Sequence, residues 1–155
     1  MTTSTMNRRK RPAIGPCALH ASALMLACAL LTLPAAAADP PLLAVELNKL
    51  ETYDKGCRAY VVVNNAGEQA FQTVKVDLVL FQPDGVIARR FAVDLGPLKS
   101  AKRTVKLFDV EGLACDKIAS VLVNDVMECK ADSGVIPDCL SKISLSSVAA
   151  APLNK

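Results

Sequence analysis

The chain has 155 residues, with 18 Lys and Arg, 15 Asp and Glu and one histidine, for a formal net charge of +3. Four of the basic residues (8–11) and the histidine, His20, precede residue 39, so the rest of the chain has a net charge of −1 and no histidine. In that part, the composition excludes Ser–His–Asp triads and histidine-liganded metals. It also gives no electrostatic reason to bind nucleic acid.

The first 38 residues predict a cleavable signal peptide. Residues 7–11 supply a positive segment, residues 18–33 an apolar stretch, and small residues precede a predicted cleavage between Ala38 and Asp39. This order is typical of a secretory signal, and the apolar stretch is shorter than a typical membrane span. We therefore expect a periplasmic protein that meets the membrane only transiently, through this signal.

Two alternatives concern export. Arg8-Arg9 matches a twin-arginine signal weakly, because Asn7 stands where Ser or Thr is expected and no bulky apolar residue follows the pair, so the general secretory route is favoured. Met25-Leu26-Ala27-Cys28 loosely resembles a lipoprotein box. A lipid anchor at Cys28 is thus an alternative, although apolar residues continue beyond that cysteine.

Residues 39–155 predict a single all-β domain. Short runs rich in β-branched residues are separated by turn signals such as Pro83-Asp84-Gly85, and no long segment has helical period. This pattern predicts an immunoglobulin-like antiparallel β-sandwich of about seven strands, followed by a loose tail at residues 149–155. In chain order, the predicted strands are 42–50, 57–63, 71–81, 86–95, 103–108, 118–124 and 143–148.

Alternation within these runs predicts which side chains face the core. Residues 71–81 give the clearest case, since apolar and polar side chains alternate with period two. The same alternation in the fourth and fifth runs places apolar side chains inward. The predicted core is Val74, Val76, Leu78, Leu80, Phe91, Val93, Val105 and Leu107.

Four cysteines in an exported domain predict two disulfides. In an immunoglobulin-like order the second run pairs antiparallel with the fifth, which brings Cys57 and Cys115 to one pole of the sandwich. The sixth run carries the chain to the other pole, where Cys129 and Cys139 flank a loop. We therefore expect Cys57–Cys115 and Cys129–Cys139. No Cys-x-x-Cys is present, so a structural role is favoured over redox catalysis or metal binding.

No set of residues predicts catalysis, a cofactor or a metal site. Asp109, Glu111 and Asp116 lack the regular spacing of a calcium loop, and a solvated polar turn is favoured. A run of four basic residues contains Lys99, Lys102, Arg103 and Lys106, and its first three members are called the basic cluster below. The basic cluster and two apolar positions opposite the core face indicate a possible partner surface. The basic cluster is also typical of a solvated strand edge that resists aggregation. The two apolar positions are Val79 and Phe81, which a strand covered on both sides explains equally well.

The run Val61-Val-Val-Asn64-Asn65, followed by Val74 to Phe81 and Gln-Pro-Asp84-Gly85-Val-Ile, resembles FxLYD-type immunoglobulin-like domains. Stretches such as Gly56-Cys57-Arg-Ala-Tyr, Leu95-Gly96-Pro97-Leu98 and Gly112-Leu-Ala-Cys115-Asp116 resemble an uncharacterised group of proteobacterial exported proteins, often labelled only by a twin-arginine-type leader. The second resemblance covers nearly all of residues 39–155. It implies a compartment and a fold but no activity.

Three functions are compatible with these features. The favoured one is a non-enzymatic periplasmic module that binds another envelope protein or component through a sheet edge or loop. The others are a redox protein that uses Cys129 and Cys139, and an envelope protein anchored by lipid at Cys28.

Overall fold

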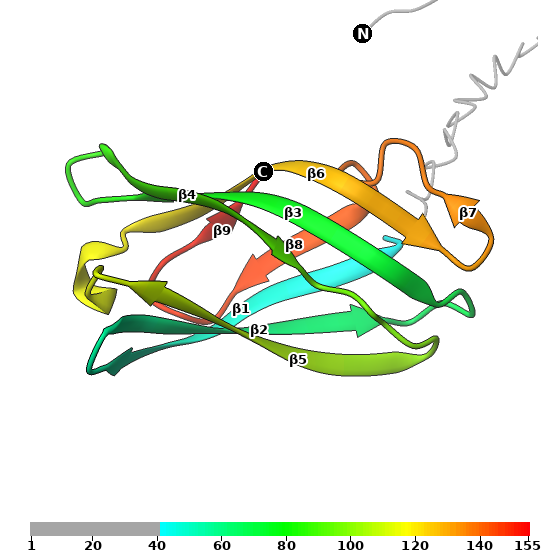
Figure 1. Cartoon of the computed structure of the whole chain (residues 1–155), viewed down its shortest axis with the longest axis horizontal. Helices are drawn as coiled ribbons and strands as arrows, with labels where there is room; N and C mark the ends of the chain where they lie inside the picture. The colour runs from blue at the N-terminus through cyan, green and yellow to red at the C-terminus, as the bar shows by residue number, and fades with distance from the viewer. Residues whose placement is uncertain (1–40) are drawn as a thin grey trace, which may run out of the picture. The chain divides into compact units, whose positions relative to one another are not determined.

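The computed structural model describes residues 41–155, which form a sandwich of two β-sheets (Figure 1). The predicted cleavage point at Ala38 and Asp39, the lipoprotein-type Cys28 and the Arg8-Arg9 pair lie outside the described residues. Within residues 41–155, no helix has the length and apolar character needed to span a membrane.

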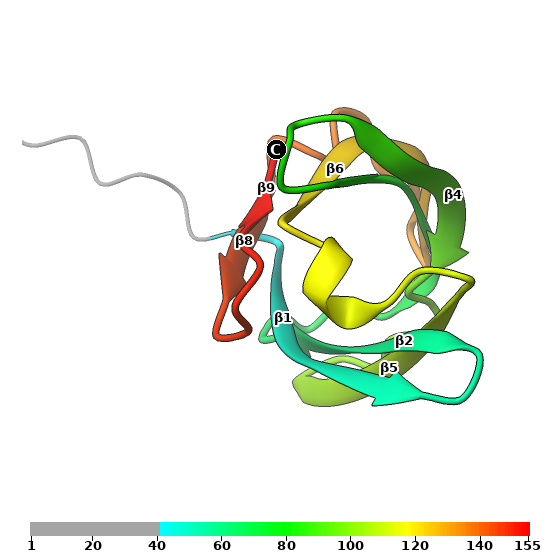
Figure 2. The same ribbon diagram turned by 90° about the vertical axis from the view of Figure 1, so that its left-hand side faces the viewer.

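The first sheet has the strand order β5-β2-β1-β8 and the second has the order β4-β3-β6-β7, with β9 also paired to β6. The end view shows the two sheets facing each other, with the short 3₁₀ helix η1 (Cys115–Lys117) near one end (Figure 2). The strands of the first sheet are β1 (Leu43–Tyr53), β2 (Gly56–Asn65), β5 (Lys102–Glu111) and β8 (Ile143–Ser147). Those of the second are β3 (Phe71–Phe81), β4 (Ile87–Asp94), β6 (Ser120–Ala131), β7 (Gly134–Val135) and β9 (Leu153–Asn154).

The all-β sandwich with two disulfides is confirmed. Five of the strand pairings are antiparallel, including the predicted pairing of β2 with β5. The last part of the chain departs from that pattern, because β8 pairs parallel with β1 and β9 pairs parallel with β6. The same segment thus contributes a strand to each sheet.

The tail predicted to be loose, residues 149–155, instead packs on the sandwich. Ala151 and Leu153 are buried, and the Val121 N–H donates to the carbonyl of Pro152. The Lys155 ammonium donates to the carbonyl of Ile143 at 2.7 Å. Two apolar side chains with the spacing of a strand are enough to hold this short segment against β6.

The core faces of β3 agree with the prediction: Val74, Val76, Leu78 and Leu80 are all buried between the sheets. Phe91 and Val93 of β4 are partly buried against the same core. The alternation of β3 is therefore a reliable register signal, since a slip of one residue would exchange its two faces.

The prediction for β5 is wrong, because Val105 and Leu107 face solvent. The register with β2 places Lys106 opposite Val61 and Val110 opposite Cys57, and opposite residues of an antiparallel pair share a face. Val61 and Cys57 are buried, so the even-numbered residues of β5 face inward. Lys106 is tolerated there because β5 is an edge strand, and its ammonium reaches the Gly96 carbonyl at 2.7 Å.

Candidate functional site

An apolar patch lies on the outer face of the first sheet, defined by Tyr60, Val62, Val105 and Leu107. Val105 is 56% exposed and Leu107 is 51% exposed. The strand register places Val62 opposite Val105 and Tyr60 opposite Leu107, so the four side chains are adjacent on one face. Large apolar side chains that are exposed together, rather than singly, mark a candidate interaction surface.

The sequence analysis missed this patch because it assigned Val105 and Leu107 to the core. A signal was present in the two residues that follow, since Phe108 and Val110 continue the alternation on the other face. Strand β5 therefore has apolar side chains on both faces, and only the register with β2 decides between them.

Charged side chains border the patch on the β1 side. Lys49 lies opposite Tyr60 in the register, with its ammonium 5.4 Å from the centre of the Tyr60 ring. The Tyr60 hydroxyl donates to Glu51, and this hydrogen bond raises the pKa of Tyr60. Hydrogen bonds from Lys49 and then from Tyr60 lower the pKa of Glu51. Tyr60 is thereby held in place at neutral pH.

A second ion pair borders the patch towards the end of β5. The Arg58 guanidinium donates two hydrogen bonds to Asp109, from Nε at 2.6 Å and from Nη2 at 2.9 Å. Hydrogen bonding from Arg58 is the main reason why the pKa of Asp109 is lowered. An apolar centre with a polar border is the usual anatomy of a protein-binding surface.

The patch adjoins a free strand edge. Strand β5 is the end strand of the first sheet, next to β2 (Figure 1). In an antiparallel pair, alternate residues direct their backbone N–H and C=O groups to the neighbour and away from it. The Gly112 N–H donates to the Lys55 carbonyl across this pair. The backbone N–H and C=O groups of the even-numbered residues therefore point to β2, and those of the odd-numbered residues point to the free edge.

Arg89 closes one end of this edge. Its guanidinium donates to the carbonyl of Glu111 at 2.9 Å, from the side opposite to β2. A side chain from β4 therefore occupies the edge position at Glu111. The stretch of β5 from Arg103 to Asp109 is left with outward-directed backbone groups.

The basic cluster lies at the start of β5, next to this edge. Lys99, Lys102 and Arg103 are all exposed, and none of the ion pairs in the described residues includes them. The connection between β4 and β5 is held by the buried Asn65, whose side-chain amide donates to the carbonyls of Gln69 at 2.7 Å and Lys99 at 3.0 Å. The structure thus brings this part of the predicted partner surface beside the apolar patch.

The other part of that predicted surface is wrong. Val79 is buried at 5% exposure and Phe81 is partly buried, both on the second sheet and away from the basic cluster. Strand β3 is central in its sheet, so Val79 lies between Arg90 of β4 and Leu122 of β6. Neighbouring side chains on both flanks cover it.

An ion-pair network occupies this outer face of the second sheet. The Asp77 carboxylate is buried and accepts hydrogen bonds from Arg90 at 2.8 Å and from Asn124 at 2.8 Å. The hydrogen bond from Arg90 is the main reason why the pKa of Asp77 is lowered, against the opposing effect of burial. Arg90, one of two adjacent arginines in β4, therefore forms a structural ion pair with Asp77.

Both predicted disulfides are present. Cys57 of β2 is bonded to Cys115 of η1, and Cys129 of β6 is bonded to Cys139. Cys57, Cys129 and Cys139 are buried, which removes them from contact with redox partners. Cys115 is partly buried, and the two disulfides together indicate an oxidising compartment.

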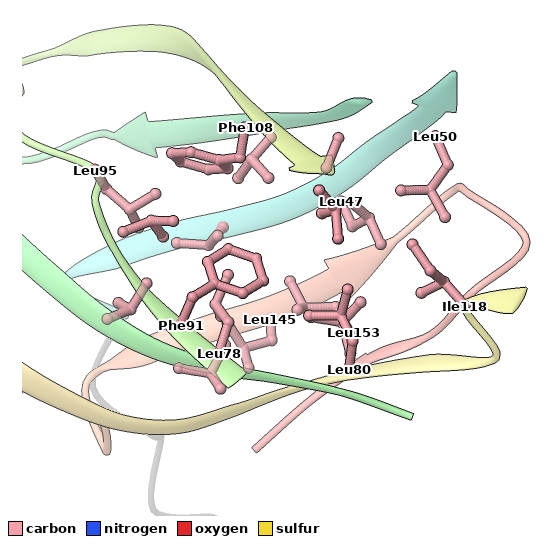
Figure 3. A pocket seen from close by; sticks show the side chains of 18 of the residues that line it. Leu47, Leu50, Leu78, Leu80, Phe91, Leu95, Phe108, Ile118, Leu145 and Leu153 are labelled. Carbon is pink, nitrogen blue, oxygen red and sulfur yellow. The ribbon is translucent and has the colours of Figure 1, made fainter. Parts of the chain in front are cut away.

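The interior holds one apolar cavity of about 40 Å³ between the sheets. Figure 3 shows leucine and phenylalanine side chains from both sheets that point into it, among them Leu47, Leu78, Phe91 and Phe108. A pocket for a small molecule is typically about 300–1,000 Å³ with a few polar groups. This cavity is far smaller and its lining is wholly apolar, so it is a packing space and not a binding site.

Within residues 41–155, no three His, Cys, Asp or Glu side chains are grouped as a metal site. Asp109 instead pairs with Arg58, and Asp116 lies 3.4 Å from Lys117. A scan of protein-family models finds no match to this chain, and neither does a search of curated proteins or of solved structures. The geometry of the site itself is therefore the basis on which a function is assigned.

Proposed function

We propose that this chain is an exported, non-enzymatic β-sandwich of the periplasm that binds another protein of the envelope. The binding surface is the outer face of the first sheet, where the apolar patch adjoins the basic cluster. The observation that carries this proposal is the exposure of Val105 and Leu107 beside Tyr60 and Val62, inside a border of fixed ion pairs.

The physical case rests on what this surface would gain from a partner. Each exposed apolar side chain that a partner covers contributes about 25 cal/mol per Å² of area removed from water. Lys49, Glu51, Arg58 and Asp109 are already paired with one another around the patch, so a partner need not strip them of water to reach the apolar centre. The basic cluster adds long-range attraction for an acidic partner.

Site-specific photo-crosslinking in intact cells tests this function. A photoreactive phenylalanine analogue placed at Leu107 should crosslink to a reproducible envelope protein. The matched control places it at Lys75, which is exposed on the second sheet. Equal products from both positions, or no product from Leu107, would contradict the proposal.

The alternative of a lipid anchor is tested separately by the mass of the exported protein. We expect an N-terminus at Asp39 with no added mass. An N-terminus at Cys28 with the mass of acyl chains would instead establish the lipid-anchored form, which is compatible with the same binding face.

A further inference from the structure

We propose that the free edge of β5 pairs antiparallel with β5 of a second copy of this chain, which joins two first sheets into one continuous sheet. The inference goes beyond the proposed function and does not depend on it, because it concerns the strand edge and not a different protein on the outer face. The evidence comes from the backbone of β5, from its charge order and from its apolar side chains.

The backbone supplies the first argument. Between Arg103 and Asp109, the odd-numbered residues direct N–H and C=O groups away from β2. Arg89 occupies the edge at Glu111, so the free stretch ends at Asp109. Pairing about a two-fold axis at Lys106, the middle of this stretch, satisfies the backbone groups of the whole stretch in both copies.

The order of charges along β5 supplies the second argument. The strand begins with Lys102 and Arg103 and ends with Asp109 and Glu111. In an antiparallel pair centred on Lys106, Arg103 lies opposite Asp109 of the second copy, on the outer face. Asp109 already accepts from Arg58, and a carboxylate with two oxygens can accept from a second guanidinium. A parallel pair in register would instead place like charges side by side.

The apolar side chains supply the third argument. The same register places Val105 opposite Leu107 of the second copy, and Leu107 opposite Val105. These are the most exposed members of the apolar patch, and cross-strand pairs of branched aliphatic side chains stabilise a sheet. The two patches thereby become one apolar surface that crosses the two-fold axis.

The inner face is compatible with this register. Lys106 lies on the axis and therefore opposite Lys106 of the second copy, and the ammonium of each donates to the Gly96 carbonyl of its own chain at 2.7 Å, so each charge has a partner within its own chain. Thr104 lies opposite Phe108 of the second copy. The other long edge, β4, is less suited to self-pairing, because Arg89 and Arg90 lie next to each other near its start.

Sedimentation of the exported protein, purified from the full-length chain, tests the pairing. The wild-type protein should be a dimer that dissociates on dilution within about 1–100 µM, with a dissociation constant that rises with salt. R103E should weaken the dimer at least about tenfold, because it replaces two opposite-charge pairs by two like-charge pairs. The matched control K99E makes the same change of charge outside β5 and should leave the constant within about twofold.

A charge exchange separates this contact from any effect on folding. R103E and D109K should each associate at least about tenfold more weakly alone than the wild type, but a mixture of the two should form a mixed dimer in which both 103–109 pairs are again of opposite charge. Far-ultraviolet circular dichroism should show both variants folded. A monomeric wild type at every concentration, or a mixture no more associated than its components, would overturn the pairing. If a crosslink from Leu107 to a different envelope protein persisted in that case, the proposed function would stand without it.

Discussion

The outer faces of the two sheets distribute their charged and apolar side chains in opposite ways. On the second sheet, the centre of the face is a buried carboxylate, Asp77, which pairs with the Arg90 guanidinium and accepts a hydrogen bond from Asn124. On the first sheet, the centre is apolar and the ion pairs lie at its border. Exposed apolar side chains occur on both sheets, including Ile87 and Met127 of the second, but on the first sheet Val105 and Leu107 are adjacent on one face to Val62 and Tyr60. This difference is the basis for the proposal that a partner covers the first face, whereas the second is held together by contacts within the chain.

The largest expected change in the free energy of unfolding comes from replacing a leucine that is buried between the sheets. Leu78→Ala deletes a side chain buried between the sheets and should lower the free energy of unfolding by about 2–5 kcal/mol. The same change at Leu107, on the uncovered face, should alter it by no more than about 0.5 kcal/mol. Denaturant unfolding measures both. Similar losses at the two positions would mean that β5 has the opposite register.

The disulfides give the next largest effect. Cys57→Ala with Cys115→Ala opens a sequence separation of 58 residues, whereas Cys129→Ala with Cys139→Ala opens one of 10. Each bridge should contribute about 2–4 kcal/mol, and loop-closure entropy makes the longer one worth about 1.6 kcal/mol more. Thermal unfolding of the two double variants checks the ranking. A greater loss for the shorter loop would show that the entropy of the unfolded chain does not dominate.

A smaller effect should separate the two ion pairs. Asp77→Asn removes a buried carboxylate that holds Arg90 and Asn124, while Asp109→Asn weakens a pair whose side chains are 38% and 39% exposed. Because an exposed pair is screened by water, its loss should cost less. Unfolding at low and high salt tests this, since only the Asp109 pair should weaken clearly as salt rises. Equal salt dependence would contradict the contrast between the faces.

Acid should lower the free energy of unfolding by protonating the same carboxylates, and this effect should be smallest near neutral pH. The pKa of Asp77 is lowered from its ordinary value of 3.8, so the unfolded chain binds more protons than the folded chain between the two values. The stabilisation is complete above the ordinary value and is lost as the pH falls through the lowered one. Asp77→Asn should therefore unfold with a flatter dependence on pH below about 4. An unchanged slope would assign the acid sensitivity to Glu51 or Asp109 instead.

The sequence was sufficient to predict the sandwich, β3 and both disulfides. Strand β3 is central, so its inner face is strictly apolar and the alternation is unambiguous. The cysteine pairing followed from the antiparallel relation of β2 and β5, which depends on strand order and not on fine register. Coarse topology was therefore accessible from local patterns.

Faces that depend on neighbouring strands were not predictable in the same way. Edge strand β5 carries apolar residues on both faces, and Lys106 can reach solvent from an inward position, so its own alternation is ambiguous. The sequence of β3 alone predicts that Val79 is exposed, but side chains of β4 and β6 cover it. The docking of Leu153 depends on a parallel pairing with a strand about thirty residues earlier.

The parallel pairing of β8 with β1 also constrains the order of folding. Leu43 pairs with Ile143, and the Ser147 hydroxyl donates to Leu47 across a separation of 100 residues. Contacts this distant in sequence close slowly, because the intervening chain must lose entropy before they form. During synthesis, almost all of the remaining chain must therefore be made before β8, the second neighbour of β1, exists. Until then β1 is itself an open edge of the first sheet, and chaperones or a fast disulfide between Cys57 and Cys115 would be most valuable in that interval.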